Sequence, residues 1–402
     1  MSAENGAPGI PSFAAEILRR LEAAGFEAWL VGGCVRDLLR GELPHDYDIA
    51  TAARPEEVAA VFDRTAPTGV RYGTTTVFCG GGQAEVTTFR GESGYSDGRR
   101  PDRVRFGTDL KADLARRDFT VNAMALHPDR GLRDPYGGQV DLHTRVIRAV
   151  GDPARRFGED ALRILRAYRF AARLGFAVEP ATLAAARAGM GLTARLSGER
   201  IRAELEAILL GPRPSAALVL TGDGLFAALG FAPRPGVSAG VLERCPLTSR
   251  ARWAAFLALT GLSATAVARR LRFDNATRQG ASAILAELER QPPSTDTAMR
   301  RRLRHTPPDV FAEYLRVDAA LAGRDPAGAL VRLGGILQRG EACSLSQLAV
   351  GGEDLRAAGI RPGPEYARIL GTLLDRVIDD PALNRPDTLH AMISSLRGRA
   401  AP

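Results

Sequence analysis

The segment Leu30–Thr51, which reads LVGGCVRDLLRGELPHDYDIAT, limits the possible folds more than any other part of this 402-residue chain. An apolar run ends at Gly32-Gly33, and the spacing of the apolar residues that follow predicts a helix. Two glycines allow the backbone to approach a ligand closely, and a helix start offers free N–H groups to an anion. A phosphate fits there, with Arg36 one turn into the helix as a clamp. The alternative is a tight turn without a ligand.

Ten residues after Arg36, the chain reads Asp46-x-Asp48 in the alternating run 46–51, which predicts a half-buried strand. Side chains at i and i+2 share one face of a strand, so the carboxylates would lie roughly 6 Å apart and repel each other by about 3 kcal/mol. A divalent cation between them removes that cost, and Mg²⁺ favours one or two carboxylates together with substrate phosphates. The alternative is a pair of solvated aspartates on an edge strand.

The two parts of the chain carry different patterns. Before about residue 150, short apolar runs bounded by glycines predict strands, whereas past Asp152 helical spacing of Ala, Leu and Arg dominates to the end. We therefore predict an α+β fold whose second part is all helical. The local predictions are a helix at Ser12–Ala24, a hairpin of Thr74–Cys79 with Ala84–Phe89, and a strand at Val121–Leu126.

Arginine dominates the charge of the chain. Lys111 is the only lysine, and 54 Lys+Arg against 46 Asp+Glu give a net charge of +8. The planar guanidinium suits phosphate and the RNA backbone, so a nucleic-acid partner is one explanation, and a GC-rich genome that encodes its cations as arginine is another. Apolar (45%) and charged (25%) residues occur in globular proportions, which exclude a disordered or fibrous chain.

The four cysteines, Cys34, Cys79, Cys245 and Cys343, lie far apart and form no C-x-x-C pair, so we expect neither a disulfide framework nor a zinc site. No apolar run approaches the ~20 residues that a membrane-spanning helix needs. Residues 1–11 lack the apolar core of a signal peptide. These features predict a soluble protein of a reducing compartment, the cytoplasm, with no membrane partner.

The arrangement G-G-x-V-R-D, followed by D-x-D ten residues after its arginine, resembles the head domain of class II nucleotidyltransferases. This family comprises the tRNA CCA-adding enzymes and the bacterial poly(A) polymerases. The resemblance implies that Asp46 and Asp48 bind the catalytic Mg²⁺ ions, and that Gly32-Gly33 and Arg36 hold the nucleoside triphosphate. It also implies a third carboxylate on a neighbouring strand, for which Glu85 is the candidate; the alternative is that Glu85 is an exposed strand residue.

Further motifs follow in the order that this family shows. Arg116–Ala123 is similar to the family's R-R-D-F-T-x-N-A motif, which implies that Arg117 contacts the phosphates or ribose and that Asp118 holds the sugar or a guanidinium. Asp134–Leu142 resembles the next element, whose glycine pair is expected to form a hinge. Leu196–Leu205 resembles the last core motif, which is expected to brace the helices that follow the head.

The segment Gly158–Phe170, GEDALRILRAYRF, predicts one helix with a charged half, although a solvated helix would show the same pattern. In the family, E-D-x-x-R on this helix recognises the incoming base. This implies that Asp160 and Arg163 read the base and that Glu159 orients Arg163. Because an aspartate only accepts hydrogen bonds and an arginine only donates them, the pair imitates a Watson–Crick partner. Arg166 and Arg169 are then expected to contact the triphosphate or the primer.

Within the family, Pro67–Val77 resembles the P-T-G-x-x-H-G-T-V-T-V segment of CCA-adding enzymes, with Tyr72 in place of the histidine. The loop Tyr95–Phe106 is present, whereas enzymes that add only CC tend to have it shortened. The expected activity is template-independent addition of C, C and A to the 3′ end of tRNA from CTP and ATP, with release of pyrophosphate and two metal ions. The alternatives are a poly(A) polymerase, a partial CC- or A-adding enzyme, and a non-catalytic RNA-binding scaffold.

The resemblance also divides the chain, and it implies no obligate protein partner. The expected parts are an N-terminal helix of the head (1–27), a nucleotidyltransferase head with a mixed or antiparallel sheet (28–142), a helical neck for base recognition and RNA binding (143–210), a helical body (211–290) and a helical, tRNA-binding tail (291–402).

Two basic clusters, Arg269–Arg272 and Arg300–Arg304, lie in the predicted body and tail. They are expected either to follow the tRNA backbone or to form solvated arginine faces.

Overall fold

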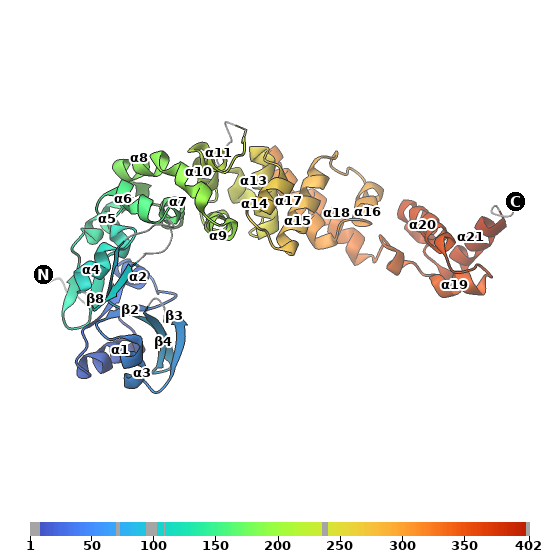
Figure 1. Ribbon diagram of the computed structural model, residues 1–402. Helices are drawn as coiled ribbons and strands as arrows, with labels where there is room; N and C mark the ends of the chain where they lie inside the picture. The colour runs from blue at the N-terminus through green and yellow to red at the C-terminus, as the bar shows by residue number, and fades with distance from the viewer. Residues whose placement is uncertain (1–8, 70–72, 94–102, 108, 235–239, 399–402) are drawn as a thin grey trace, which may run out of the picture. The chain divides into compact units, whose positions relative to one another are not determined.

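The computed structural model describes residues 9–69, 73–93, 103–107, 109–234 and 240–398 (Figure 1). The chain separates into two compact units, Met1–Pro235 and Gly236–Pro402. The first unit combines a sheet with helices, and the described residues of the second form helices only, so the predicted α+β fold is confirmed. The boundary between the units falls inside the predicted body, 211–290, and the five-part division stays a prediction.

A seven-stranded mixed sheet forms the centre of the first unit, in the order β3-β4-β5-β2-β1-β8-β9. Neighbouring strands run antiparallel except β2 and β5, which run parallel. The bounds are β1 Ala28–Val31, β2 Asp48–Thr51, β3 Thr65–Gly69, β4 Thr74–Cys79, β5 Gly82–Thr88, β8 Ala125–His127 and β9 Gly131–Arg133, with a separate ribbon of β6 Arg90–Ser93 and β7 Arg103–Phe106.

The central strands of this sheet are buried on both faces. All four residues of β1 are buried. Leu30 belongs to the cluster that contains the apolar side of helix α1 (Ser12–Ala23), whereas Trp29 and Val31 belong to a cluster on the other face. A strand that is covered on both sides needs apolar residues at every position, and this explains the unbroken apolar run of the sequence. The predicted first helix is confirmed and ends at Ala23.

The predicted hairpin is also confirmed. β4 pairs antiparallel with β5 along its whole length, and the chain turns at Gly80 and Gly81, which have positive φ angles of 55° and 78°. Gly82, opposite Cys79, has no room for a side chain, because a Cβ would lie 2.4 Å from Cγ of Phe13 on α1. The sequence therefore uses glycine both for the turn and for the close contact with α1.

Two strand predictions are wrong in detail. Asp46 lies in a bend, because β2 begins at Asp48, opposite Val31, the last residue of β1. The chain leaves the sheet after Val31, so Asp46 has no partner on β1. The predicted strand 121–126 is shortened by a 3₁₀ turn at Thr120–Asn122, whose polar side chains hydrogen bond to nearby aspartates, and the strand β8 starts only at Ala125.

The predicted helix 158–170 is broken in two. Helix α6 (Pro153–Glu159) is followed by Asp160 in an extended conformation with φ −144° and ψ 106°, and helix α7 (Leu162–Leu174) begins after Ala161. The Asp160 carboxylate accepts a hydrogen bond from the backbone N–H of Leu162 at 3.0 Å. Short polar side chains of this kind compete with helical hydrogen bonds, and this explains why the charge pattern alone did not reveal the break.

Helices cover the sheet and continue beyond it in the first unit (Figure 1). Strand signals do not end entirely at residue 152, since a short parallel pair joins β10 (Val146–Ile147) to β11 (Ala177–Val178). The remaining helices of this unit are α2 Gly33–Leu39, α3 Pro55–Val61, α4 Leu110–Ala115, α5 Gly138–Thr144, α8 Pro180–Ala188, α9 Gly198–Leu209, α10 Ala216–Gly222 and α11 Leu225–Ala228, with a 3₁₀ segment at Met190–Arg195.

The second unit has two hydrophobic centres. Trp253 and Phe311 are fully buried where α13, α15 and α17 pack together, and a second cluster lies among the last helices, around Leu355, Leu373 and Leu389. The helices are α12 Val241–Arg244, α13 Ser249–Thr260, α14 Ala264–Arg270, α15 Asn275–Leu288, α16 Asp296–Leu303, α17 Pro308–Ala322, α18 Ala327–Gln338, α19 Gly352–Ala357, α20 Pro364–Asp379 and α21 Pro386–Gly398.

The arginines of the 300–304 cluster pair inside the second unit. Arg300 is 5% exposed, donates to the carbonyl oxygen of Ile378 at 2.8 Å and pairs with Glu341 at 2.6 Å. Arg301 and Arg304 form ion pairs with aspartates of α20. These contacts tie α16 to α20, so the cluster serves packing as well as surface charge.

Within the described residues, no single helix is both long and apolar enough to cross a membrane. Helices α13 and α14, which are bent relative to each other, have the length and apolar composition of a membrane span only when the two are counted together.

Candidate active site

One cavity of about 630 Å³ in the first unit brings together most of the residues identified from the sequence. Eight arginines and four aspartates line it, and this excess of positive charge suits a polyanion. Of the predicted site residues, Glu85 and Glu159 do not line it. The lining residues are Gly32, Gly33, Arg36, Asp46, Asp48, Arg116, Arg117, Asp118, Asn122, Asp160, Leu162, Arg163, Arg166, Arg169, Phe170, Arg173 and Arg200.

Gly32 shapes the floor of the cavity. Its φ of 78° and ψ of −138° lie in a region that favours glycine. A Cβ on Gly32 would lie 2.8 Å from Nη1 of Arg117 and 3.3 Å from Oδ2 of Asp48. The missing side chain thus lets a guanidinium and a carboxylate approach the end of β1 together.

Arg36 is part of the cavity wall rather than a free clamp. It is 3% exposed, and Nη1 donates to Oδ1 of Asn122 at 2.6 Å while Nε donates to Oδ1 of Asp37 at 2.8 Å. Its guanidinium also lies 5.5 Å from the ring centre of Phe170. Burial lowers the pKa of Arg36, and the neighbouring Asp37 opposes that effect. Two acceptors therefore fix its position before any ligand binds.

The carboxylates gather where β2 begins. Asp48 lies in register with Glu85 of β5, while Asp46 is 84% exposed at its side chain. Burial raises the pKa of Asp48, as do the carboxylates of Glu85 and Asp46, whereas Arg117 lowers it. A cation would relieve this unfavourable arrangement. Among the described residues, no group of three or more His, Cys, Asp and Glu side chains is arranged to hold a metal ion, so further oxygen ligands would have to come from substrate or water.

The two arginines of the R-R-D-F motif share one buried acid. Oδ1 of Asp113 accepts from Arg116 at 2.8 Å, and Oδ2 accepts from Arg117 at 3.1 Å. Burial alone would raise the pKa of Asp113, but the two guanidiniums outweigh it and lower the pKa. Nε of Arg117 is buried and has no hydrogen-bond acceptor among the described residues, so this arginine retains a donor for a ligand.

Asp118 holds a guanidinium, one of the two roles expected for it. It is 8% exposed and accepts from Nε of Arg166 at 2.7 Å, from the backbone N–H of Phe119 at 2.8 Å and from Asn122 at 3.2 Å. Burial acts to raise the pKa of Asp118, but the attraction of Arg166 and these hydrogen bonds prevail and lower it to about 2. The carboxylate therefore stays ionised and anchors α7 to the head.

The break between α6 and α7 positions two charged side chains through separate partners. Glu159 pairs with Arg163 at 2.7 Å, as expected for an orienting residue, and it also pairs with Arg156 at 2.7 Å. Asp160 accepts from Arg200 of α9 at 2.9 Å. Each member of the proposed base-reading pair is thus held from the side by a residue of opposite charge.

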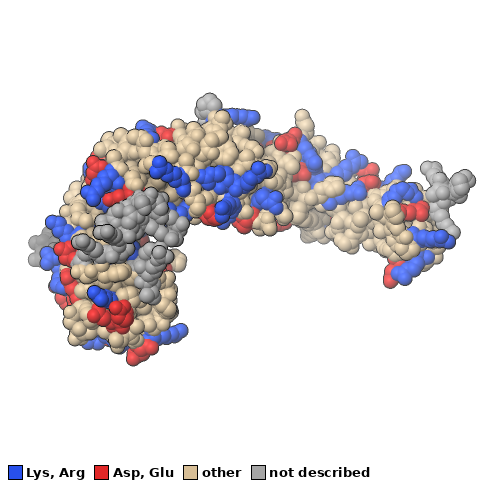
Figure 2. Space-filling view, viewed as in Figure 1, with Lys and Arg blue, Asp and Glu red and all other residues tan. Residues whose placement is uncertain are grey.

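Aromatic and acidic residues order the remaining arginines. The guanidiniums of Arg166 and Arg169 lie 5.2 and 4.3 Å from the ring centre of Phe170, and Arg169 pairs with Glu204 of α9 at 2.5 Å. Cations favour such positions over an aromatic ring. Figure 2 shows basic side chains gathered over the region of α9. The motif expected to brace the neck packs directly against α7.

Sequence reasoning assigned no site role to several residues of this site: Arg116, Asn122, Leu162, Phe170, Arg173 and Arg200, which line the cavity, and Asp113 and Glu204, which hold its arginines. Asp113 had a usable signal, because it lies in the last turn of α4, three and four residues before the two arginines that follow the helix. Arg200 and Glu204 act through contacts across the fold, for which the local sequence carries no signal.

Two further predictions concern residues outside the described ranges. The substitution at Tyr72 and the part of the loop Tyr95–Phe106 that spans residues 95–102 belong to segments whose structure is not described here.

Known proteins match most of this chain. The family profile "Poly A polymerase head domain" matches residues 28–148, and "Probable RNA and SrmB- binding site of polymerase A" matches residues 175–229. A CCA-adding enzyme of Limosilactobacillus fermentum is 39% identical over 387 residues, which cover 93% of this chain and 94% of the relative.

A crystal structure of the Bacillus stearothermophilus CCA-adding enzyme in complex with CTP superimposes with a TM-score of 0.81. The two sequences are 32% identical over 96% of this chain and 97% of that one.

Proposed function

The chain belongs to the CCA-adding enzyme family, and on that premise we propose that it adds C, C and A in turn to the 3′ end of tRNA, using CTP and ATP. The observation that carries the proposal is a single cavity lined both by the Asp46–Asp48 pair and by Asp160 and Arg163. The first pair suits a metal–triphosphate complex, and the second suits the edge of a base. Such an activity acts on tRNA and free nucleotides, and we propose that it is cytoplasmic.

We propose that Asp46 and Asp48 hold Mg²⁺. Their oxygens are the hard ligands that this ion prefers, and the raised pKa of Asp48, which follows from burial and from its acidic neighbours, is the condition that a bound cation would relieve. When bound, the metal polarises phosphoryl oxygens and lowers the pKa of the attacking hydroxyl. Two protein carboxylates leave the other coordination positions to the triphosphate, as in other phosphoryl-transfer sites.

The arginines would position and neutralise the triphosphate. Arg117, with its unpaired Nε, lies at Gly32 and beside Asp48, while Arg36 and Arg166 are held in place by Asn122 and Asp118. Donors fixed in advance stabilise developing charge without reorganising during the reaction. The tRNA 3′-hydroxyl would lose its proton to solvent and attack the α-phosphorus, the bond to the pyrophosphate oxygen would break, and the pyrophosphate would depart with its negative charge facing these guanidiniums.

Base selection would follow from the second pair that lines the cavity, Asp160 and Arg163. Asp160 offers only acceptors and Arg163 only donors, so together they suit a base edge with an amino group beside a ring nitrogen. Cytosine and adenine both present such an edge. Glu159 and Arg200 hold the two readers, so a small shift of either partner would re-aim the pair. This arrangement needs no nucleic-acid template.

The test offers the purified protein tRNAs that end before CCA, after C and after CC, with each nucleoside triphosphate separately. We expect CTP to extend the first two and ATP the third. Long A tracts, or extension of RNA without a tRNA fold, would instead identify a poly(A) polymerase. An Asp48→Ala variant separates catalysis from a scaffold role, because it should keep tRNA binding and lose incorporation.

A further inference from the structure

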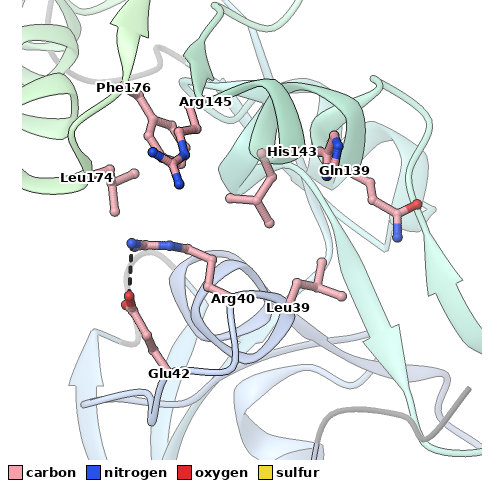
Figure 3. Close-up of a pocket in the computed structure, with 9 residues that line it drawn as sticks. Leu39, Arg40, Glu42, Gln139, His143, Arg145, Leu174 and Phe176 are labelled. Carbon is pink, nitrogen blue, oxygen red and sulfur yellow. Dashed lines mark ion pairs between the residues drawn. The ribbon is translucent and has the colours of Figure 1, made fainter.

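A second cavity of about 600 Å³ lies in the first unit and shares no lining residue with the candidate active site. Three chain segments meet around it: the end of α2 with Arg40, the end of α5 with Arg145, and the segment after α7 with Phe176. Figure 3 shows the guanidiniums of Arg40 and Arg145 extending into the same opening, with Leu174 and Phe176 beside them. The cavity thus combines an apolar wall with converging positive charge.

Arg145 adopts an unusual backbone conformation to reach this cavity. It ends α5 in the left-handed region, with φ 59° and ψ 50°, and only one other described residue besides glycine, Arg272, has a positive φ. Glycine is the usual residue at such a helix end, and a side chain there strains the backbone. Strain of this kind is common at ligand sites, where the side chain itself is needed.

The charges of this cavity are not balanced by the protein. Arg40 pairs with Glu42 at 2.9 Å and lies 5.7 Å from the ring centre of Phe176. The Arg145 side chain has no hydrogen-bond or ion-pair partner among the described residues. Two guanidiniums face one carboxylate, so an anion between them would gain two charge-assisted contacts and would compete with Glu42 for Arg40.

We propose that this cavity binds a small phosphate ester, of the size of a nucleoside monophosphate, independently of metal. Arg40 and Arg145 hold its phosphate, and its organic part lies against Phe176 and Leu174. The volume falls within the range of small-molecule pockets, which commonly join apolar walls to a few placed charges. The proposal goes beyond the nucleotidyl-transfer activity and does not rest on it.

Titration calorimetry of the full chain with AMP, in the presence of EDTA, tests this proposal. Loss of one guanidinium should weaken AMP binding tenfold or more, because hydrogen bonds between a guanidinium and a phosphate are among the strongest that a protein makes. Arg145→Gly is the most informative variant, since glycine relieves the left-handed strain and the fold should be retained. Glu42→Gln removes the competing carboxylate and should tighten AMP binding several-fold.

Control measurements separate this cavity from the active site. Arg163→Ala changes the candidate active site and should leave this metal-free AMP binding unaltered, while Arg145→Gly should leave CCA addition within twofold of the wild type. Adenosine, which lacks the phosphate, should not bind, and inorganic phosphate should bind more weakly than AMP. The proposal is overturned if AMP does not bind, if its loss follows Arg163→Ala instead of Arg145→Gly, or if inorganic phosphate binds equally well.

Discussion

The carboxylate of Asp118 accepts a hydrogen bond from Nε of Arg166 at 2.7 Å and so joins the R-R-D-F segment to the first turns of α7. This contact connects the part of the chain that carries Asp46 and Asp48, the proposed metal ligands, with the helix that carries Arg163, a proposed base reader. Because Asp118 also accepts from Asn122, which in turn accepts from Arg36, the contact continues to α2. A buried network of this kind fixes several guanidiniums at once.

We expect Asp118→Asn to make the free energy of unfolding depend less on pH under acidic conditions. The folded pKa of Asp118 is about 2, below the value of 3.8 for an ordinary aspartate. A depressed pKa contributes stability above the unfolded value, and this contribution is lost as the pH falls from 3.8 towards 2. The contribution is about 2 kcal/mol. Urea unfolding at pH 7 and at pH 3 should show a smaller difference for the variant; an identical difference would contradict the role of this pair.

We expect Asp48→Asn to abolish incorporation while stabilising the metal-free protein. Removing a metal ligand should cost several kcal/mol of transition-state stabilisation, a loss on the order of 10³-fold in rate. Because burial and neighbouring carboxylates raise the folded pKa of Asp48, its ionisation opposes folding as the pH rises above the unfolded value. Without metal at pH 7, the variant should melt on the order of 1–3 °C higher. Asp63→Asn, at an exposed aspartate, is the matched control.

As the pH is lowered, the metal affinity of the wild type should begin to fall at a higher pH than is usual for aspartate ligands. Protons compete with the metal for Asp48, whose pKa burial raises. The dependence of incorporation on Mg²⁺ concentration, measured from pH 8 down to pH 5, should therefore shift steadily to higher concentrations. A concentration dependence that stays constant across this range would argue against Asp48 as a ligand.

We expect Glu159→Gln to reduce the selectivity between CTP and ATP more than the affinity for the triphosphate. The neutral side chain holds Arg163 less firmly than the carboxylate does at 2.7 Å, so the reader loses its fixed direction. Single-nucleotide incorporation with CTP and ATP, on tRNA ending after C or after CC, should show a 10- to 100-fold loss of selectivity. A change confined to KM, equal for both nucleotides, would place Glu159 in general binding instead.

We expect Gly32→Ala to lose most activity and about 1–3 kcal/mol of stability, because the residue combines a positive φ with a Cβ position 2.8 Å from Arg117. Gly41→Ala is the control: Gly41 also has a positive φ, of 72°, but has open space around it. Gly41→Ala should lose only stability. Equal activity in the two variants would show that the close approach to Arg117 is unimportant.

The features that could be predicted from the sequence are those that neighbouring residues determine. The turn at Gly32-Gly33 and the hairpin turn before Gly82 could be predicted, because the backbone conformation at each turn favours glycine. The break at Asp160 could not, since it depends on a side chain that accepts from the backbone N–H of Leu162 and pairs with Arg200 forty residues later. Likewise, the charge pattern of α7 indicated a cationic face but not which acids hold its arginines.

The sharpest measurement is a crystal structure of the protein with Mn²⁺ and CTP. We predict an anomalous peak within bonding distance of the Asp46 and Asp48 carboxylates, with the triphosphate against the arginine wall and the cytosine edge facing Asp160 and Arg163. Nucleotide bound elsewhere, or a metal held without either aspartate, would contradict the account.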